Sequence, residues 1–368
     1  MMQYRKFGNT WLVHSALGFG MMRLQKLPDG KTDVQWAIDT LRMAIDRGLN
    51  YVDTAYVYGD SEVVTGLALR DGYREKVTLA TKMPVGNMKC EEDFERILNE
   101  QLQRLQTDHI DCLLLHGLNR DRWENEVARF HVLEHAQQAK AEGKILHLGF
   151  SFHDTLDVFE KILNGYDKWE FCQIQLNYMD TNYQAGIAGL ELAASKGLAV
   201  VIMEPLRGGY LANVTEDVAA MLPKSPVESA LDFLWDRPEV SVVLSGMSTT
   251  EQVLQNLDYA EASHPGMLTE AEKASMLEAA EKVRAQMNVP CTGCNYCSVC
   301  PKEIAIPQIF KISNQKQLDG DYAKARKDYL ALAGRTAEEC VGCRSCVEQC
   351  PQGIDIPEKL AKIHKDIN

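Results

Sequence analysis

From residue 12 to about 262, short hydrophobic runs alternate with longer amphipathic stretches. The short runs are rich in β-branched residues and too brief for helices, so they predict strands. These runs are Leu12–Gly18, Tyr51–Ala55, Val77–Lys82, Ile110–His116, Ile145–Ser151, Phe171–Asn177, Leu198–Pro205 and Val240–Gly246. The stretches between them have helical spacing, for example at Glu91–Gln106, Arg122–Glu142 and Thr181–Lys196.

Eight β/α repeats over roughly 250 residues predict an α/β protein with a closed (β/α)8 TIM barrel. An open doubly wound sheet is the alternative, but the first run ends in Gly18-Phe19-Gly20 and lacks the third glycine of a dinucleotide-binding turn. Residues 1–11 predict a small hairpin that turns at Gly8-Asn9 and plugs the barrel floor.

Helical patterns continue after the barrel, at Thr269 to about Met287, Pro307–Gln317 and Tyr322–Ala333. We therefore expect three parts: a barrel at 1–267, a connecting helix at 268–290, and a small helical ferredoxin-like domain at 291–368.

Eight of the 11 cysteines lie in this last part, in two runs that each end before a proline. The runs are Cys291, Cys294, Cys297 and Cys300, then Cys340, Cys343, Cys346 and Cys350. Three cysteines at successive x2 spacing with a fourth before proline are typical of 4Fe–4S ligands, so two runs predict two clusters. Zinc sites and disulfides are the alternatives.

The fourth cysteine of each run is expected to bind the other cluster, as in two-cluster proteins. One cluster would take Cys291, Cys294, Cys297 and Cys350, and the other Cys340, Cys343, Cys346 and Cys300. The isolated Cys90, Cys112 and Cys172 receive no role.

The formal net charge of −13 argues against nucleic acid and anionic membranes as partners. No apolar run approaches the ~20 residues of a membrane-spanning helix, and the first residues lack the apolar core of a signal peptide. A cytoplasmic location follows by default, and it disfavours disulfides.

Polar residues follow or end several predicted strands, where barrel enzymes place their chemistry. Asp53, Lys82 and His116 end strands two, three and four, and Tyr58 follows Asp53 by five residues. A carbonyl reduced by hydride needs a proton in the same step. Tyr58 could supply it as general acid, with a Lys82 ammonium stabilising the phenolate, Asp53 holding Lys82, and His116 hydrogen-bonding the carbonyl oxygen.

Three segments carry a family resemblance: Tyr51 to Gly59 (YVDTAYVYG), Ala80-Thr81-Lys82, and Leu113 to His116 (LLLH). They resemble the catalytic segments of the aldo-keto reductase superfamily, and the resemblance covers about residues 3 to 262. With the cysteine tail, the chain is similar to a bacterial and archaeal branch that carries a C-terminal 4Fe–4S domain. The resemblance selects Tyr58 over Tyr56 as the acid.

The resemblance also implies cofactor-binding residues for NADP(H) or NAD(H). Ser151 and Gln175 match positions that hold the nicotinamide carboxamide, and Met203 stands where the family has a stacking aromatic. Positions that usually bind a 2′-phosphate fall at Gly246 and Gln252, so the choice between NADP and NAD stays open. The full expected set is Ser151, Gln175, Pro205, Leu206, Gly246, Ser248, Gln255 and Asn256. Backbone N–H groups from Ser248 to Thr250 could bind phosphate, while Ser248 and Glu251 equally form a helix capping box.

The leading hypothesis is an oxidoreductase that interconverts a small aldehyde or ketone and its alcohol with a nicotinamide cofactor. Alternatives are a barrel that holds FMN and passes electrons to an external carrier, clusters that are purely structural, and a binding barrel without catalysis. The substrate is not encoded in a readable pattern.

Overall fold

The computed structural model describes residues 1–332 and 334–367, which form two compact units. The first comprises Met1–Pro205 and Ala230–Thr269, and the second comprises Leu206–Ser229 together with the chain from Glu270 onward. The predicted boundaries at 267/268 and 290/291 stay a prediction, because this division follows different breaks.

A closed barrel of eight parallel strands forms the first unit, in the order β10-β3-β4-β5-β6-β7-β8-β9. The strands are β3 (Leu17–Gly20), β4 (Tyr51–Asp53), β5 (Thr78–Met83), β6 (Ile110–Leu118), β7 (Ile145–Phe152), β8 (Phe171–Gln175), β9 (Ala199–Met203) and β10 (Val240–Ser245). The predicted (β/α)8 fold is confirmed. Because every neighbouring pair is parallel, all carboxyl ends meet at one end of the barrel.

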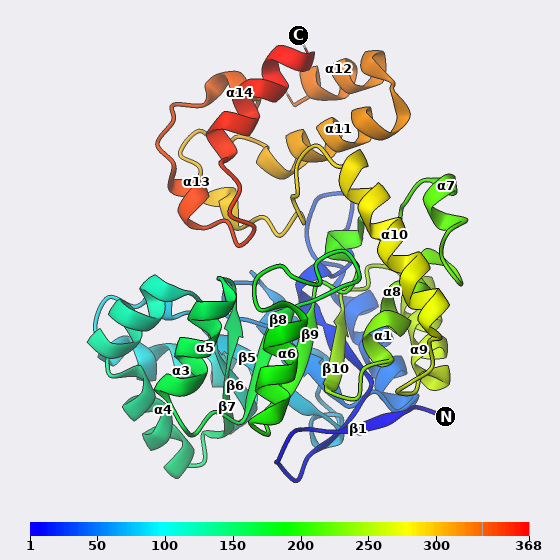
Figure 1. The fold of residues 1–368 in the computed structure, drawn as a ribbon. Coiled ribbons are helices and arrows are strands. Elements are labelled where there is room, and N and C mark those ends of the chain that lie inside the picture. The colour runs from blue at the N-terminus through cyan, green and yellow to red at the C-terminus, as the bar shows by residue number, and fades with distance from the viewer. Residues whose placement is uncertain (333, 368) are drawn as a thin grey trace. The chain divides into compact units, whose positions relative to one another are not determined.

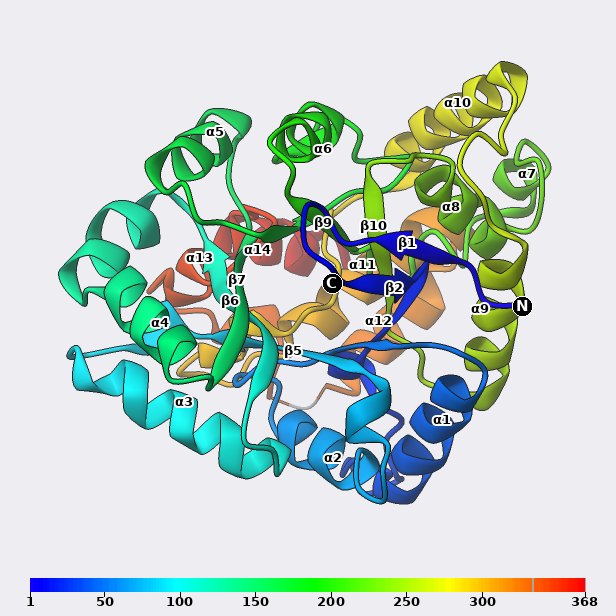
Figure 2. The ribbon, with the colours of Figure 1, turned by 90° about the horizontal axis from the view of Figure 1, so that it is seen from below.

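Helices surround this barrel, as the view along its axis shows (Figure 2). They are α1 (Val34–Asp46), α2 (Ser61–Ala68), α3 (Glu92–Leu105), α4 (Val132–Ala141), α5 (Leu156–Gly165), α6 (Gly186–Ser195), α8 (Pro226–Trp235) and α9 (Thr250–Ala262). The predicted helix Arg122–Glu142 is divided into a π-helical turn, Arg122–Val127, and α4, because His131 has a positive φ of 45° between them.

The predicted first strand, Leu12–Gly18, is wrong as one element. Val13–Ser15 forms β2, which pairs antiparallel with β1 (Tyr4–Lys6), and the barrel strand β3 begins only at Leu17. The break follows from Ser15, whose N–H donates to Asn50 Oδ1 and whose hydroxyl donates to the Leu17 carbonyl. An unbroken apolar run does not reveal such a change of partner.

The hairpin β1–β2 packs against the starting ends of the barrel strands (Figure 2). Phe7 is fully buried, and its ring lies 5.9 Å from that of Tyr51 and 5.3 Å from that of Phe171, the first residues of β4 and β8. At Gly8 (φ 55°), an added Cβ would lie 2.4 Å from Ala199 N. The hairpin therefore closes the end opposite the strand carboxyl ends.

The second unit is helical (Figure 1). It contains α7 (Glu216–Ala219), α10 (Glu270–Gln286), α11 (Ile306–Asp319), α12 (Tyr322–Leu330), α13 (Ser345–Glu348) and α14 (Ile356–Ile367). Its core includes Ile306, Ile309, Phe310, Tyr329, Ile356, Leu360 and Ile363. The predicted helix Tyr322–Ala333 is present up to Leu330, and Ala333 lies outside the described residues. Across residues 1–332 and 334–367, no helix has the length and apolar character to cross a membrane.

Candidate functional site

Three of the four predicted catalytic residues lie on adjacent strands of the barrel. Asp53 is the last residue of β4, Lys82 lies near the end of β5, and His116 lies on β6. Asp53 is in register with Ala80 of β5, and Lys82 with Leu114 of β6. The strand-end positions seen in the sequence therefore become neighbours at the carboxyl end of the barrel.

Lys82 and Asp53 form a buried ion pair. The Lys82 ammonium donates to Asp53 Oδ1 at 2.5 Å and to the Thr54 carbonyl at 2.8 Å, and the two side chains are 1% and 5% exposed. Burial lowers the pKa of Lys82 and raises that of Asp53, while each charge opposes the shift of the other. The pair thus places a paired cation deep in the site.

Tyr58 and His116 complete the group. Lys82 Nζ lies 5.0 Å from the centre of the Tyr58 ring, and the Tyr58 and His116 ring centres are 5.9 Å apart with their planes at 84°. Burial lowers the pKa of His116 well below its usual value, and the Lys82 and Arg122 cations act in the same direction. A neutral imidazole can donate one hydrogen bond to a substrate oxygen.

Tyr56, the competing acid, is engaged elsewhere. Its hydroxyl donates to Glu100 Oε2 at 2.7 Å, and Arg104 lies 4.2 Å from the centre of its ring. This arrangement directs the Tyr56 hydroxyl to the helix layer at α3 and leaves Tyr58 as the tyrosine beside Lys82.

The expected carboxamide-binding residues also lie at strand ends. Ser151 is buried on β7, where its hydroxyl accepts a 2.7 Å hydrogen bond from Gly117 N. Gln175 ends β8 and donates to Asp180 Oδ2 at 2.8 Å; Asn177 donates to the same oxygen at 3.1 Å. Sequence reasoning missed Asp180, which accepts from the Gln175 amide, and Asn177, which donates to the same carboxylate.

Four of the expected cofactor-binding residues, Gly246, Ser248, Gln255 and Asn256, follow β10. Asn256, buried on α9, donates to the Ser245 hydroxyl at 2.8 Å, and Gln255 is exposed beside it. The helix cap of α9 is Thr249, which accepts from Gln252 N, so the predicted cap at Ser248 is wrong. Ser248 instead donates its hydroxyl to the Arg23 carbonyl at 2.7 Å, and its N–H to Gln252 Oε1.

Arg23 brings a cation to this cluster that the sequence did not reveal. An added Cβ at Gly246 would lie 3.3 Å from carbons of the Arg23 side chain, so the arginine lies across the glycine. The Arg23 guanidinium is 3.8 Å from Glu204 Oε1, just after β9. Pro205 is buried next to Glu204, and Leu206 begins the part of the second unit that follows β9.

In the second unit, cysteines of the two runs lie close to one another and pack against the same core. Burial raises the pKa of the Cys297 thiol to about 12, and the neighbouring thiols of Cys294, Cys291 and Cys350 contribute. Burial likewise raises the pKa of Cys346, with contributions from Cys300, Cys340 and Cys343. The last cysteine of each run therefore lies near the third cysteine of the other run, Cys350 near Cys297 and Cys300 near Cys346.

The two runs also share a backbone conformation. Gly293 and Gly342 both have φ of 68°, and the residues two further on, Asn295 and Arg344, both have φ of 65°. No group of three or more His, Cys, Asp or Glu residues in 1–332 and 334–367 is spaced to hold a single metal ion. Thiols around a cubane contact four separate irons, which requires a wider spacing.

A repeated motif after each run was missed in the sequence. The pattern Cys-Pro-x-x-Ile-x-Ile-Pro occurs at 300–307 and at 350–357, and each copy leads into a helix, α11 or α14. Its isoleucines, Ile304, Ile306, Ile354 and Ile356, are all buried in the core of the unit. Comparing the two runs beyond their prolines would have found it.

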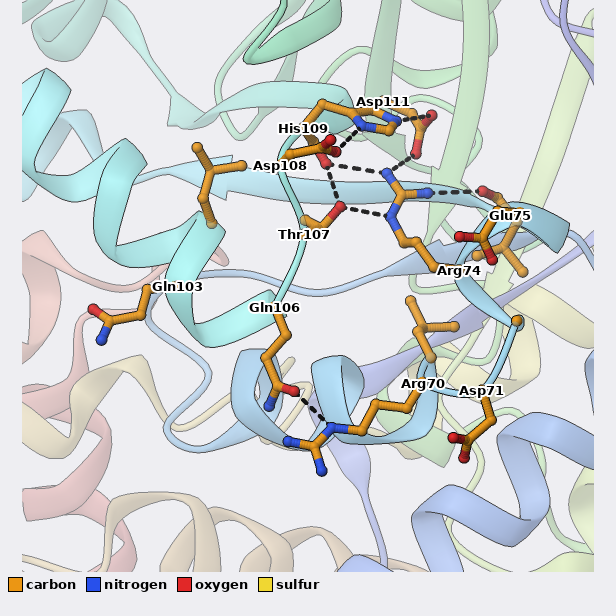
Figure 3. A pocket seen from close by; sticks show the side chains of 14 residues that line it. Arg70, Asp71, Arg74, Glu75, Gln103, Gln106, Thr107, Asp108, His109 and Asp111 are labelled. Atoms are coloured by element: carbon orange, nitrogen blue, oxygen red, sulfur yellow. Dashed lines mark hydrogen bonds and ion pairs between the residues drawn. The ribbon is translucent and has the colours of Figure 1, made fainter.

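A hollow of about 940 Å³ lies far from this chemistry, at the starting ends of β5 and β6 (Figure 3). Its charged lining is paired internally: Arg74 Nη2 lies 2.7 Å from Asp111 Oδ2, and Arg70 donates to Gln106. Residues at that end of a (β/α)8 barrel usually serve stability rather than catalysis.

Comparison with known proteins gives a family match for each of the two parts of the chain. The pattern of the aldo/keto reductase family matches residues 16–276, and that of a 4Fe-4S dicluster domain matches residues 290–354. L-galactose dehydrogenase of Arabidopsis thaliana is 29% identical over 288 residues, covering 69% of this chain and 87% of that protein. NADH-specific methylglyoxal reductase of Escherichia coli is 27% identical over 232 residues, covering 57% and 69%.

Solved structures give the same result for the barrel. The holo form of aldo-keto reductase AKR11C1 from Bacillus halodurans superposes with a TM-score of 0.65 and 25% sequence identity, over 76% of this chain and 96% of that one. The superposition does not span the whole of the present chain, in keeping with the additional cysteine-rich region.

Proposed function

Because the chain belongs to the aldo/keto reductase family and carries a 4Fe–4S dicluster domain, we propose that it interconverts a small aldehyde or ketone and its alcohol with a nicotinamide cofactor. The observation that carries this proposal is the Tyr58 ring beside a buried Lys82–Asp53 pair, with His116 at its edge. This is the set of groups that proton-coupled hydride transfer to a carbonyl requires.

Tyr58 donates the proton to the substrate oxygen in reduction and removes it in oxidation. The Lys82 ammonium stabilises the phenolate that remains after donation, and Asp53 keeps the ammonium charged and oriented. His116, held neutral by burial, donates a hydrogen bond to the same oxygen and orients the carbonyl. A nicotinamide cofactor, when bound, would supply or accept the hydride.

The residues around β7, β8 and β10 fit a dinucleotide. Buried polar side chains, Ser151, Gln175 and Asn256, lie at strand carboxyl ends where barrels bind ligands. Arg23 offers a positive charge next to Gly246, where the family's phosphate-binding cation would stand. A 2′-phosphate would therefore find a partner, which favours NADP(H) over NAD(H).

For the second unit we propose two 4Fe–4S clusters with crossed ligation. The grouping of Cys350 with Cys291, Cys294 and Cys297, and of Cys300 with the other run, supports this ligand set. Thiolates are the usual ligands of such clusters, which exchange single electrons. An external electron carrier is the partner that these clusters would serve.

A flavin in the barrel is a second candidate, because hydride moves two electrons and each cluster accepts one. Met203 ends β9 in the place of the family's stacking aromatic. Anaerobic purification followed by an absorption spectrum and mass spectrometry of the extracted cofactor distinguishes the two. Extracted FMN would replace the nicotinamide proposal, whereas a nicotinamide dinucleotide, or tight binding of one without flavin, supports it.

The proposed acid is tested by Tyr58→Phe, with Tyr56→Phe as the matched control. Loss of a general acid costs about 10²–10⁴-fold in turnover, while dinucleotide binding should persist. Tyr56→Phe removes a hydroxyl that contacts Glu100 instead, so it should leave turnover within a few-fold. Equal effects of both substitutions would remove Tyr58 from this role.

A further inference from the structure

A second carboxylate, Glu62 on α2, is buried on the outer side of the strand that carries Lys82. The Glu62 side chain is 1% exposed, and its Oε1 accepts from the Thr81 hydroxyl at 2.7 Å and from Gln101 Nε2 at 2.9 Å. Successive side chains of a strand point to opposite faces, so Thr81 faces the helices while Lys82 faces the barrel interior. Glu62 therefore contacts the residue before Lys82.

Gln101 on α3 extends this contact to Lys82 itself. Its Nε2 donates to Glu62, to the Thr81 hydroxyl at 3.2 Å, and to the Lys82 carbonyl at 3.1 Å. Gln101 is fully buried, and its Oε1 has no hydrogen-bond partner within residues 1–332 and 334–367. An unsatisfied buried acceptor is unfavourable. Gln101 nevertheless keeps this orientation, because the groups around its Nε2 are acceptors.

The charges around Lys82 come from several elements. Asp53 on β4 pairs with it directly, the Tyr58 ring lies beside it, and neutral His116 faces it from β6. Glu62 is the other carboxylate that acts on Lys82, favouring its charged form. On its far side, Glu62 Oε2 is 3.3 Å from Arg104 Nη1, on a side chain that is 32% exposed.

We propose that Glu62 is a positioning residue for the reaction: it holds the β5 backbone at Lys82 through Thr81 and Gln101, and its negative charge supports the Lys82 ammonium. The inference rests on the proposed function, since it assigns a task to Lys82. The hydrogen bonds of Glu62 go to Thr81, Gln101 and Arg104, so its effect passes through Lys82.

Glu62→Gln tests the charge while preserving size and an acceptor oxygen. Removing an anion makes loss of a proton easier for its neighbours, so the alkaline limb of the pH profile of kcat/KM for reduction should move to lower pH. We expect a shift on the order of half to one pH unit, with kcat falling more than KM changes. Glu100→Gln is the matched control, because Glu100 also pairs with Arg104, at 3.7 Å, but bonds Tyr56 and Arg96.

Arg104→Gln gives an independent test that does not require Glu62→Gln to fold. It leaves the Glu62 charge without this cation, so the alkaline limb should move to higher pH. Unmoved limbs in both Glu62→Gln and Arg104→Gln, or the same shift in Glu100→Gln, would overturn the proposal. If Tyr58→Phe abolishes reduction while these profiles stay fixed, only the role of Glu62 fails; if Tyr58→Phe has no effect, the proposed function fails first.

Discussion

Gly208, in the segment that follows β9, lies against the first cysteine run. Its φ is 66°, and an added Cβ would lie 2.0 Å from the Thr292 carbonyl oxygen and 2.7 Å from its carbonyl carbon. Both atoms belong to the backbone, so no side chain can rotate away. Thr292 directly follows Cys291, and any displacement at this point moves a proposed cluster ligand.

Gly208→Ala should therefore destabilise the second unit, and Gly209→Ala is the matched control. Gly209 has a φ of 90°, but an added Cβ there meets nothing within 4 Å. Both alanines would cost about 1–2 kcal/mol for a left-handed L-residue. Only Gly208→Ala adds overpacking, a further ~1–3 kcal/mol, or roughly 5- to 150-fold in an equilibrium between closed and open segments.

The assay is iron release to a chelator from anaerobically purified protein, together with iron content per chain and the apparent midpoint of thermal unfolding. We expect wild type to release iron most slowly, Gly209→Ala somewhat faster, and Gly208→Ala fastest, with one cluster depleted first. If the two variants had identical iron-release rates and unfolding midpoints, the overlap of the added Cβ with the Thr292 carbonyl would not destabilise the unit.

Two further substitutions test the ligand assignments. Arg23→Ala should weaken NADP(H) binding about 10-fold more than NAD(H) binding, because a charge-assisted hydrogen bond contributes ~1.5–3 kcal/mol. Titration calorimetry with both dinucleotides measures the two affinities. Equal weakening of both would contradict the assignment of Arg23 to the 2′-phosphate. Cys350→Ala should give an electron paramagnetic resonance spectrum like that of Cys294→Ala, whereas a spectrum like that of Cys343→Ala would show uncrossed ligation.

The proximity of Asp53, Lys82 and His116 could be predicted because parallel strands bring their carboxyl ends together. Once Asp53, Lys82 and His116 were placed at strand ends, their proximity followed from the barrel alone. The first barrel strand was misplaced because Leu12–Gly18 is a continuous apolar run. Its division at Ser15 depends on the Asn50 side chain, 35 residues away, which no local pattern encodes.

The supporting residues could not be predicted, because their partners come from distant segments. Glu62 lies within reach of Thr81 only when α2 and α3 pack on β5, and Gln101 is an ordinary helical glutamine until then. Arg23 reaches Gly246 across more than 200 positions of sequence. Such contacts depend on the closed barrel, and the sequence around each residue carries no signal of them.

The segment after β9 continues the chain directly from the first unit into the second. Residues 206–229 are built into the second unit: Arg207 contacts Met287, Thr215 bonds Gln286, Asp217 pairs with Lys282, and Gly208 abuts Thr292. Leu206 directly follows Pro205, the last residue of this segment of the first unit. In the first unit, Glu204 pairs with Arg23 at the proposed phosphate position.

Residues 206–209, where Gly208 lies against Thr292 of the first cysteine run, are only a few positions from Glu204 in the sequence. Glu204 itself has a φ of 56°, a conformation that few non-glycine residues adopt and that the surrounding structure must hold in place. Because Glu204 pairs with Arg23, a change in the order of this short segment would alter the proposed dinucleotide affinity. A structural role and an electron-transfer role of the proposed clusters would be compatible, since the first acts through the backbone and the second through the irons.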